Sequence, residues 1–365
     1  MNTLLRVLRD EGWQSAARRT RERLGESAQR LWQNVRGCIG HGERAPVLNV
    51  CGMPVLPRLG GLPIQLATRL AAEARQRTVA LYEPGRLRVG GQARPCGSLA
   101  VACARTGAAI VHIEGTSGMD LAEVLALPIA TRLLLSLHDL ALLDAPAALR
   151  TALFARCTAV LYPSDFLARA YAVRGRVLAP PTPATAPRGT PRPDRLRVAY
   201  VGAAKRHKGA ALLPELIATA APDLEWHVCG GGDAERLLAA LRGRARVRVH
   251  GYVCAARIPR LLRRHCIGVA LLPSLVPESF SLTLSECWLA GVPAIAFDHG
   301  ALGERIRLGQ GAPWLAPSGS GVEGLRDVLA QWRAGSLAHP ALPAPTPADH
   351  AAMAMCELYR GLLPE

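Results

Sequence analysis

Two glutamates, Glu278 and Glu286, are placed where they could bind a polar ligand together. Glu278 follows the apolar run Ile267–Leu272, and Glu286 lies inside Ser279–Ala290, a segment long enough for a helix that Gly291 ends. A carboxylate on a helix between two buried strands costs free energy unless another group pairs with it. The two glutamates are therefore candidate ligand-binding groups.

The segments around the glutamates predict one βαβ unit. The apolar run before Glu278 suits a parallel strand buried on both faces, and Pro293–Phe297 begins a second strand. The right-handed crossover of such a unit brings the loop that holds Glu278 to the carboxyl edge of the sheet. In a helix that begins at Ser279, Leu282 and Glu286 lie on the same face as that first residue. Glu286 would then look into the same cleft as Glu278.

The lysines mark a second candidate segment. Of the 44 basic residues only Lys205 and Lys208 are lysine, and both fall in the loop after the expected strand 196–202. A compact ammonium group on a flexible stem is a good point-charge ligand for phosphate. The loop, which also contains Gly202 and Gly209, is therefore predicted to bind phosphate.

The glutamate pair and the sequence after it resemble a known family. Glu278-x7-Glu286, the following AGVPAIAF and Gly300-x-x-x-Glu304 resemble the Glu-x7-Glu signature of retaining glycosyltransferases of family 4. The resemblance implies the GT-B fold, an α/β architecture in which two Rossmann-like domains face each other across a cleft. It also implies transfer of a sugar from a nucleotide-diphosphate sugar to a hydroxyl group, with retention of configuration and without a metal ion or other cofactor.

The resemblance implies a role for each candidate. Glu278 would hold sugar hydroxyls at the catalytic centre, and Glu286 would accept hydrogen bonds from the ribose. His138, at the end of an expected strand, would contact the donor sugar and the β-phosphate as a second catalytic residue. The remaining donor-binding candidates are Gly60, Gly61, Gly202, Lys208, Ser279, Phe280, Ser281 and Leu282.

One position departs from the family pattern. The arginine that follows the first glycine of the phosphate loop is Ala203 here, so Lys205 or Arg206 would have to supply the missing charge. His112 is a further candidate, because it lies on the expected strand 108–115. The alternative for such a lone histidine is a structural, hydrogen-bonded side chain.

The order of the predicted elements indicates two α/β domains. The resemblance is strong over about 196–316, looser over 47–177 and absent over 1–46. The predicted divisions are a basic amphipathic helical segment over 1–46, a Rossmann-like acceptor domain over 47–178, an extended Pro-rich linker over 179–195, a donor domain over 196–340 and a last helix over 341–365 that crosses back to the first domain.

Charge and hydropathy limit the function classes. The net charge is +16, but the arginines are spread along the chain and aromatic residues are few, which makes a nucleic-acid surface the weaker interpretation. An anionic membrane surface fits better, and segment 1–46 could lie on it or pack on the first domain. No window has the apolar length of a membrane span, and no signal peptide is visible.

Cysteine spacing predicts no metal site. The ten cysteines are scattered, without a Cys-x-x-Cys pair and without clustered histidine and cysteine spacing. We therefore expect reduced thiols in a cytosolic protein, and neither a zinc site nor a disulfide framework.

Together these observations predict a cytoplasmic glycosyltransferase, peripheral on the inner membrane face, that builds cell-surface polysaccharide. Its partners would be a nucleotide sugar and a glycan or lipid-linked acceptor, and nucleic acid is not expected. Three alternatives stay open: a non-catalytic scaffold or sugar-nucleotide sensor, which Ala203 favours, a basic nucleic-acid-binding protein, and an enzyme of the same fold with other chemistry, such as a sugar-nucleotide epimerase.

Overall fold

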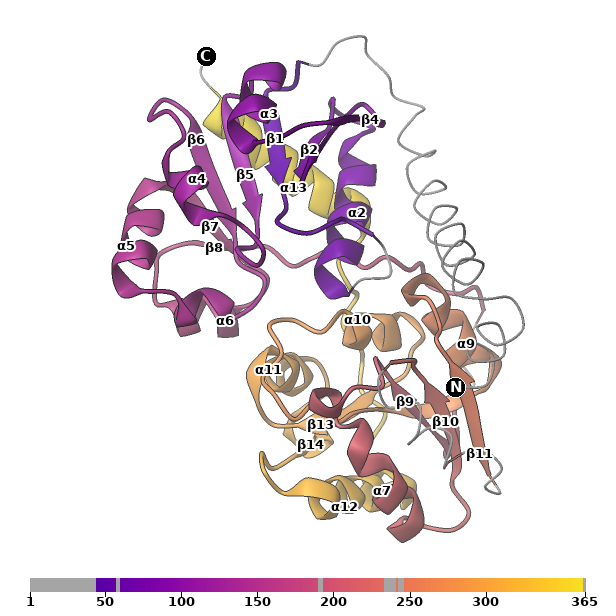
Figure 1. Ribbon diagram of the computed structural model, residues 1–365. Helices are drawn as coiled ribbons and strands as arrows, with labels where there is room; N and C mark the ends of the chain where they lie inside the picture. Colours follow the sequence, from indigo (N-terminus) through magenta and orange to yellow (C-terminus); the bar gives the residue numbers. More distant parts are fainter. Residues whose placement is uncertain (1–43, 57–59, 190–192, 233–240, 242–245, 364–365) are drawn as a thin grey trace, which may run out of the picture. The chain divides into compact units, whose positions relative to one another are not determined.

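The computed structural model describes residues 44–56, 60–189, 193–232, 241 and 246–363 (Figure 1). The helical segment predicted over 1–46 therefore lies outside the described residues except for its last three. The sequence AERLLAALRG over 234–243 predicts a further helix, which lies outside them except for Leu241.

The chain forms two compact units, which we describe separately. The first unit contains the described residues up to Pro181 together with the segment from Thr346 onward, and the second is Thr182–Pro345. Each unit is built on a sheet that is largely or wholly parallel, so the predicted α/β class with two Rossmann-like units is confirmed.

The sheet of the first unit has eight strands within the described residues, in the order β4-β3-β2-β1-β5-β6-β7-β8. Its neighbours pair in parallel except for β2 with β3 and β3 with β4. The strands are β1 (Val47–Val50), β2 (Ala80–Glu83), β3 (Arg86–Val89), β4 (Gln92–Pro95), β5 (Ile110–Glu114), β6 (Arg132–Ser136), β7 (Cys157–Tyr162) and β8 (Arg176–Val177).

Helices cover both faces of this sheet. The C-terminal helix lies beside α2, although 274 residues lie between the two helices in the sequence (Figure 1). The helices are α2 (Gly61–Glu73), α3 (Leu99–Thr106), α4 (Leu121–Leu125), the 3-10 helix η1 (Ala141–Asp144), α5 (Ala147–Arg156), α6 (Asp165–Tyr171) and α13 (Ala348–Leu362).

Side-chain alternation divides the buried groups of this sheet between its two faces. Leu48, Val111 and Leu133 belong to the apolar core under α3, α4, α5 and α6. Their neighbours point the other way, and the strand register places Asn49 beside His112 on that opposite face. There α2 and α13 enclose a polar cluster, which becomes the site described below.

The sheet of the second unit is parallel throughout, in the order β11-β10-β9-β12-β13-β14. Its strands are β9 (Asp194–Val201), β10 (Glu225–Cys229), β11 (Val247–Gly251), β12 (Ile267–Leu272), β13 (Ala294–Phe297) and β14 (Leu315–Ala316). Its helices are η2 (Arg206–Lys208), η3 (Ala210–Leu212), α7 (Leu213–Thr219), η4 (Ala255–Arg257), α9 (Ile258–Arg264), α10 (Leu282–Leu289), α11 (Gly300–Gly309), η5 (Ala312–Trp314) and α12 (Gly321–Arg333).

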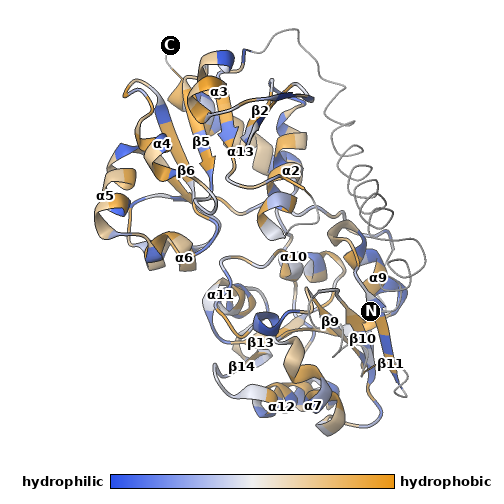
Figure 2. Ribbon diagram, viewed as in Figure 1, coloured by the Kyte–Doolittle hydropathy of each residue, from blue (hydrophilic) through white to orange (hydrophobic). Residues whose placement is uncertain are grey.

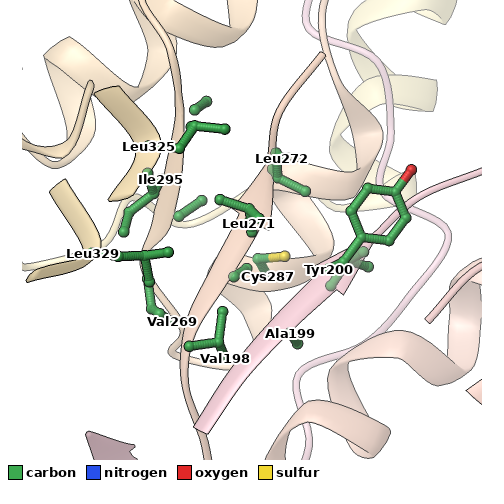
Figure 3. Packing of buried hydrophobic residues seen from close by; sticks show 14 of the residues in the cluster. Val198, Ala199, Tyr200, Val269, Leu271, Leu272, Cys287, Ile295, Leu325 and Leu329 are labelled. Carbon is green, nitrogen blue, oxygen red and sulfur yellow. The ribbon is translucent and has the colours of Figure 1, made fainter. Parts of the chain in front are cut away.

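Of the two central strands of this sheet, β12 is buried throughout and β9 is buried over its second half. All six residues of β12 are buried, as its uninterrupted apolar run predicts. Figure 3 shows Val198 and Tyr200 of β9 beside Leu271 of β12, with Cys287 of α10 and Leu329 of α12 packed around them. The colouring by hydropathy agrees with this burial. The central strands contain many hydrophobic residues, whereas α9 carries many hydrophilic ones (Figure 2).

The helix that holds Glu286 begins later than the sequence predicts. Ser281 is the N-cap of α10, its hydroxyl accepts a hydrogen bond from the amide of Leu284, and its φ of +71° breaks the helical backbone. Ser279 therefore precedes the helix, and the predicted helix face shared by Ser279 and Glu286 is wrong. No helix within the described residues is long and apolar enough to span a membrane.

Candidate active site

The loops after β9 and β12 pack closely because these strands are neighbours in the sheet. The amide of Leu275 donates to the carbonyl of His207 at 2.8 Å. Gly209 has a φ of +73°, and a Cβ there would lie 1.9 Å from the carbonyl oxygen of Pro273. Only glycine fits this approach, and the approach brings Lys208 to the second loop.

Lys208 and Glu278 form an ion pair across the two loops. Lys208 Nζ lies 3.0 Å from Glu278 Oε1, and the two side chains are 32% and 13% exposed. Both groups therefore remain within reach of a ligand while they neutralise each other. The predicted phosphate-binding lysine and the first glutamate of the pair thus lie together in the second unit.

The backbone of Glu278 is fixed by the start of α11. The amide of Ala301 donates to the Glu278 carbonyl at 2.8 Å. Gly300 has a φ of +61°, and a Cβ there would lie 2.7 Å from the Glu278 nitrogen. The Gly300-x-x-x-Glu304 pattern therefore begins with a glycine because the Glu278 loop lies against it.

Arg305 holds the residues between Glu278 and α10, a role that the sequence did not reveal. Its guanidinium donates to the carbonyls of Phe280 at 2.9 Å and Ser281 at 2.7 Å, and to Ser285 Oγ at 2.8 Å. It also stacks 3.8 Å from the centroid of the Phe280 ring. Burial lowers the pKa of Arg305 to about 9, while the nearby charge of Glu278 acts in the opposite direction. The predicted donor-binding residues Phe280 and Ser281 are thus positioned by a half-buried cation.

Glu286 is a buried carboxyl on α10, only 4% exposed. Among the described residues its carboxylate has no hydrogen bond or ion pair, and burial alone raises its pKa to about 8. A buried carboxylate without a partner is costly. Glu286 is therefore suited to a ligand that brings hydrogen-bond donors.

The remaining residues of the predicted phosphate loop, 202–206, lie outside the Lys208–Glu278 ion pair. Gly202, with a φ of +147°, follows β9, and a Cβ on the neighbouring Gly230 would lie 1.9 Å from its carbonyl oxygen. Ala203, Lys205 and Arg206 are exposed. The loop can thus offer positive charge to a ligand even though alanine occupies the family's arginine position.

In the first unit, Arg69 of α2 and Glu114 of β5 form a buried ion pair. Arg69 also donates to Asn49 Oδ1 at 3.0 Å and lies 2.8 Å from Glu73. Burial by itself would raise the pKa of Glu114, but Arg69 and the neighbouring histidines hold that pKa well below its usual range. Glu114 is therefore ionised in the folded protein.

His138 lies at the accessible border of this cluster. Gln65 Nε2 donates to its Nδ1 at 2.8 Å, which leaves the ring proton on Nε2, facing Glu114 Oε2 at 3.4 Å. Glu114 and Gln65 thus fix the tautomer and orientation of the predicted catalytic histidine. The cluster orients His138 while leaving its side chain 14% exposed.

His112 has a different environment from His138. It is fully buried, and its two ring nitrogens contact Tyr359 Oη at 2.6 Å and Ser136 Oγ at 2.7 Å. Burial lowers the pKa of His112 to about 3, despite the nearby Glu114. The structure thus favours the structural alternative, in which His112 joins β5 to α13.

A cavity of ≈ 150 Å³ borders this polar cluster within the first unit. Its polar wall contains Gln65, Arg69 and His138. Its apolar wall is formed mainly by Leu66, Leu161, Leu178, Ala351, Ala354 and Met355. A cavity of this size can take a ring-sized group.

The predicted glycine pair begins α2. Gly60 is the N-cap residue, with a φ of +129°, and Gly61 is the first residue of the helix. A Cβ at either position would meet nothing within 4 Å. The helix start is therefore accessible, and its backbone amides offer partial positive charge.

Comparison with known proteins finds a family match within the second unit. Residues 195–332 match the family model of glycosyl transferases group 1. The match spans the Lys208 loop, both glutamates and Arg305. A search of curated proteins gave no match.

Solved glycosyltransferase structures share the fold of the chain at low sequence identity. Sucrose-phosphate synthase from Thermosynechococcus elongatus has a TM-score of 0.63 and 18% identity, over 87% of this chain and 99% of that one. Anabaena HepE in complex with UDP and glucose gives 0.56 and 14%, over 87% and 100%. AviGT4, a glycosyltransferase involved in avilamycin A biosynthesis, gives 0.56 and 17%, over 87% and 98%. These likenesses establish the GT-B fold.

Proposed function

Because residues 195–332 match the model of glycosyl transferases group 1 and the chain has the GT-B fold, we propose that it transfers a sugar from a uridine-diphosphate sugar, with retention of configuration, to a glycan or lipid-linked acceptor. The observation that carries the proposal is the ion pair between Lys208 and Glu278 on adjacent loops. The choice of uridine rests on the HepE structures, whose titles name UDP and UDP-glucose.

The ion pair can change partners when the donor binds. The leaving diphosphate gains negative charge as the sugar departs, and fixed positive charge lowers the barrier to that departure. Lys208 would exchange Glu278 for the diphosphate, supported by the amides that follow Gly202. Glu278 would then be free to hold the sugar hydroxyls, with its charge toward the cation-like sugar carbon. This arrangement supplies the required charge from protein groups and needs no metal ion.

The ribose of the donor would satisfy Glu286. Ribose hydroxyls donate hydrogen bonds that the buried oxygens of Glu286 can accept, and such bonds favour the ionised form of its carboxyl. Arg305 would hold the backbone of Phe280 and Ser281 in place for the same donor. Retention would follow from attack on the face that the diphosphate leaves, without an assigned enzyme nucleophile.

The first unit would take the acceptor. Its cavity combines an apolar wall with Gln65, Arg69 and the oriented ring of His138, which suits a sugar or a lipid-linked group. We assign His138 to the same reaction as a catalytic residue, and Gly60 and Gly61 to anion binding at the start of α2. The charge of +16 supports an acceptor carried on an anionic, cytoplasmic membrane face, as in the synthesis of surface polysaccharide.

The test is a donor screen with matched variants. Purified protein is incubated with uridine-, guanosine- and thymidine-diphosphate sugars, and binding is followed by calorimetry and thermal shift. We expect one uridine-diphosphate sugar to bind and the variant Glu286→Ala to lose that binding. The control Glu215→Ala, an exposed glutamate on α7, should bind normally. Equal binding by both variants would refute the site.

The exposed Ala203 favours a second candidate, a non-catalytic sugar-nucleotide sensor. Such a protein would bind the donor through Lys208 and Glu286 but would release no nucleoside diphosphate, either to water or to an acceptor. Measurement of nucleoside diphosphate release with membrane extracts as acceptor separates the two functions. Binding without any release would favour the sensor.

A further inference from the structure

Three histidines of the second unit meet although they are far apart in the sequence. His227 lies on β10, His250 on the edge strand β11, and His265 caps the C-terminus of α9. Their ring centroids are 4.8–5.2 Å apart. Sequence spacing predicted no such cluster, because the three residues come from separate elements.

The strand register explains how the cluster forms. Side chains of β10 and β11 that share a face lie next to each other, and His227 is paired with Arg248, two residues before His250. His265 follows the last residue of α9. The next residue, Cys266, has a φ of +50° and connects the helix to β12. The backbone of His265 is held by Arg197, which donates to its carbonyl at 3.1 Å.

We propose that His227, His250 and His265 bind one divalent zinc ion. His227 Nδ1 lies 3.0 Å from His250 Nε2, and one nitrogen from each ring lies within 4.8 Å of the others. Nitrogen ligands of a tetrahedral zinc ion are about 3.3 Å apart, given bonds of about 2.0–2.1 Å. Small rotations of the half-buried His250 and His265 rings bring the three donors to that spacing.

The three ligand atoms are all imidazole nitrogens, and this determines the choice of metal. Imidazole nitrogen is a borderline ligand that suits zinc and neighbouring transition metals, while magnesium and calcium prefer oxygen. The neutral imidazole ring is the form that metals bind, so zinc affinity should fall at acidic pH. Three protein ligands leave the fourth position of zinc for water.

The charges around the cluster are mixed. Arg248 lies 3.4 Å from His265 Nδ1 and opposes a cation, but it is exposed and therefore screened. Arg197 lies 3.0 Å from Glu225 and 3.4 Å from Asp194, which offset its charge. Arg264, the last residue of α9, directly precedes His265 and is a third cation near the cluster.

Zinc at this place would join β10, the edge strand β11 and the end of α9. The Lys208–Glu278 ion pair lies on the loops after other strands, β9 and β12, so the role of the metal is structural. The proposal stands apart from the donor chemistry, and its test needs no sugar nucleotide.

The test is titration of the full chain, without a histidine tag and after treatment with a chelator. We expect zinc to bind with a stoichiometry of one by calorimetry, and cobalt to give the visible spectrum of a low-coordinate nitrogen site. The variants His250→Gln and His265→Gln should weaken zinc binding more than about tenfold, because even loss of an outer partner of a ligand costs about 10–100-fold. Zinc should also raise the Tm of the wild-type protein and not that of these variants.

Two further variants complete the design. His339→Gln changes an exposed histidine elsewhere in the unit and should bind zinc like the wild type. Arg248→Gln removes the opposing charge and should tighten binding. Failure of the wild type to bind one equivalent would overturn the proposal, as would equal affinity in His250→Gln, His265→Gln and His339→Gln, with circular dichroism showing that each variant is folded.

Discussion

Lys208 Nζ lies 3.0 Å from Glu278 Oε1, and this ion pair joins the loops that follow the neighbouring strands β9 and β12. A lysine that is already paired adds little free positive charge to the unliganded protein. A diphosphate changes that balance, because it competes for Lys208 and releases Glu278. The pair thus links occupation of the phosphate site to the state of the glutamate proposed to hold the sugar.

Loss of the lysine should therefore lower the rate more than it lowers ground-state affinity. We expect Lys208→Met to reduce kcat by about 10²–10³-fold, the usual effect of removing one group that stabilises developing negative charge. Lys205→Met, a change of the same type in the same loop, should reduce kcat far less. Initial rates of nucleoside diphosphate release check both variants. Equal losses in the two would show that charge in the loop matters and that the ion pair does not.

Glu286 should make the stability of the protein depend on pH. Its carboxyl is neutral in the folded state up to about pH 8 but has its ordinary pKa of 4.5 in the unfolded chain, so the folded state loses stability as pH rises between these values. The slope for one such group is at most about 1.4 kcal/mol per pH unit. Glu286→Gln removes it, so the stability of this variant relative to wild type should increase from pH 5 to pH 8. Denaturant unfolding at several pH values measures the difference, and parallel curves would contradict it.

Parts of this arrangement could be predicted from sequence because the signals are local. The apolar run of β12 predicted a buried parallel strand. Ser164 is a local signal of the same kind, because serine is a common N-cap residue and its hydroxyl caps α6. The hairpin of β3 and β4 also has a local signal in the sequence. Gly90 and Gly91 both have positive φ and connect the two strands, as expected for a Gly-Gly turn.

Other features depend on contacts between distant segments. The late start of α10 is set by Ser281 and by Arg305, which binds the carbonyl of Ser281 from α11. The bond between His112 and Tyr359 spans 247 residues. No window of sequence contains both partners of such a contact, so spacing alone could not identify the structural role of His112.

Arg305 should be required for both stability and donor affinity. Its removal leaves the carbonyls of Phe280 and Ser281 and the hydroxyl of Ser285 without their donor, so we expect Arg305→Ala to destabilise the fold by about 2–5 kcal/mol. Arg305→Lys keeps the charge but cannot bond all three acceptors, so it should stay folded and show a raised KM for the donor. Arg307→Lys, an exposed position on the same helix, is the control. A normal KM in folded Arg305→Lys would show that the loop keeps its conformation without the guanidinium.

Tyr359→Phe should separate the structural role of His112 from the proposed catalytic role of His138. The change removes one hydroxyl from the buried cluster and leaves His112 Nδ1 without the group that lies 2.6 Å away, so the free energy of unfolding should fall by about 1–3 kcal/mol. The orientation of His138 is set by Gln65 and Glu114, so kcat should change little in the folded variant.

Gln65→Leu should have the opposite profile, with near-normal stability and lower kcat, because the His138 ring loses the donor that fixes its tautomer. Denaturant unfolding and initial rates on the two variants give both quantities. A large fall in kcat for Tyr359→Phe at full folding would mean that His112 and Tyr359 act on the reaction through His138.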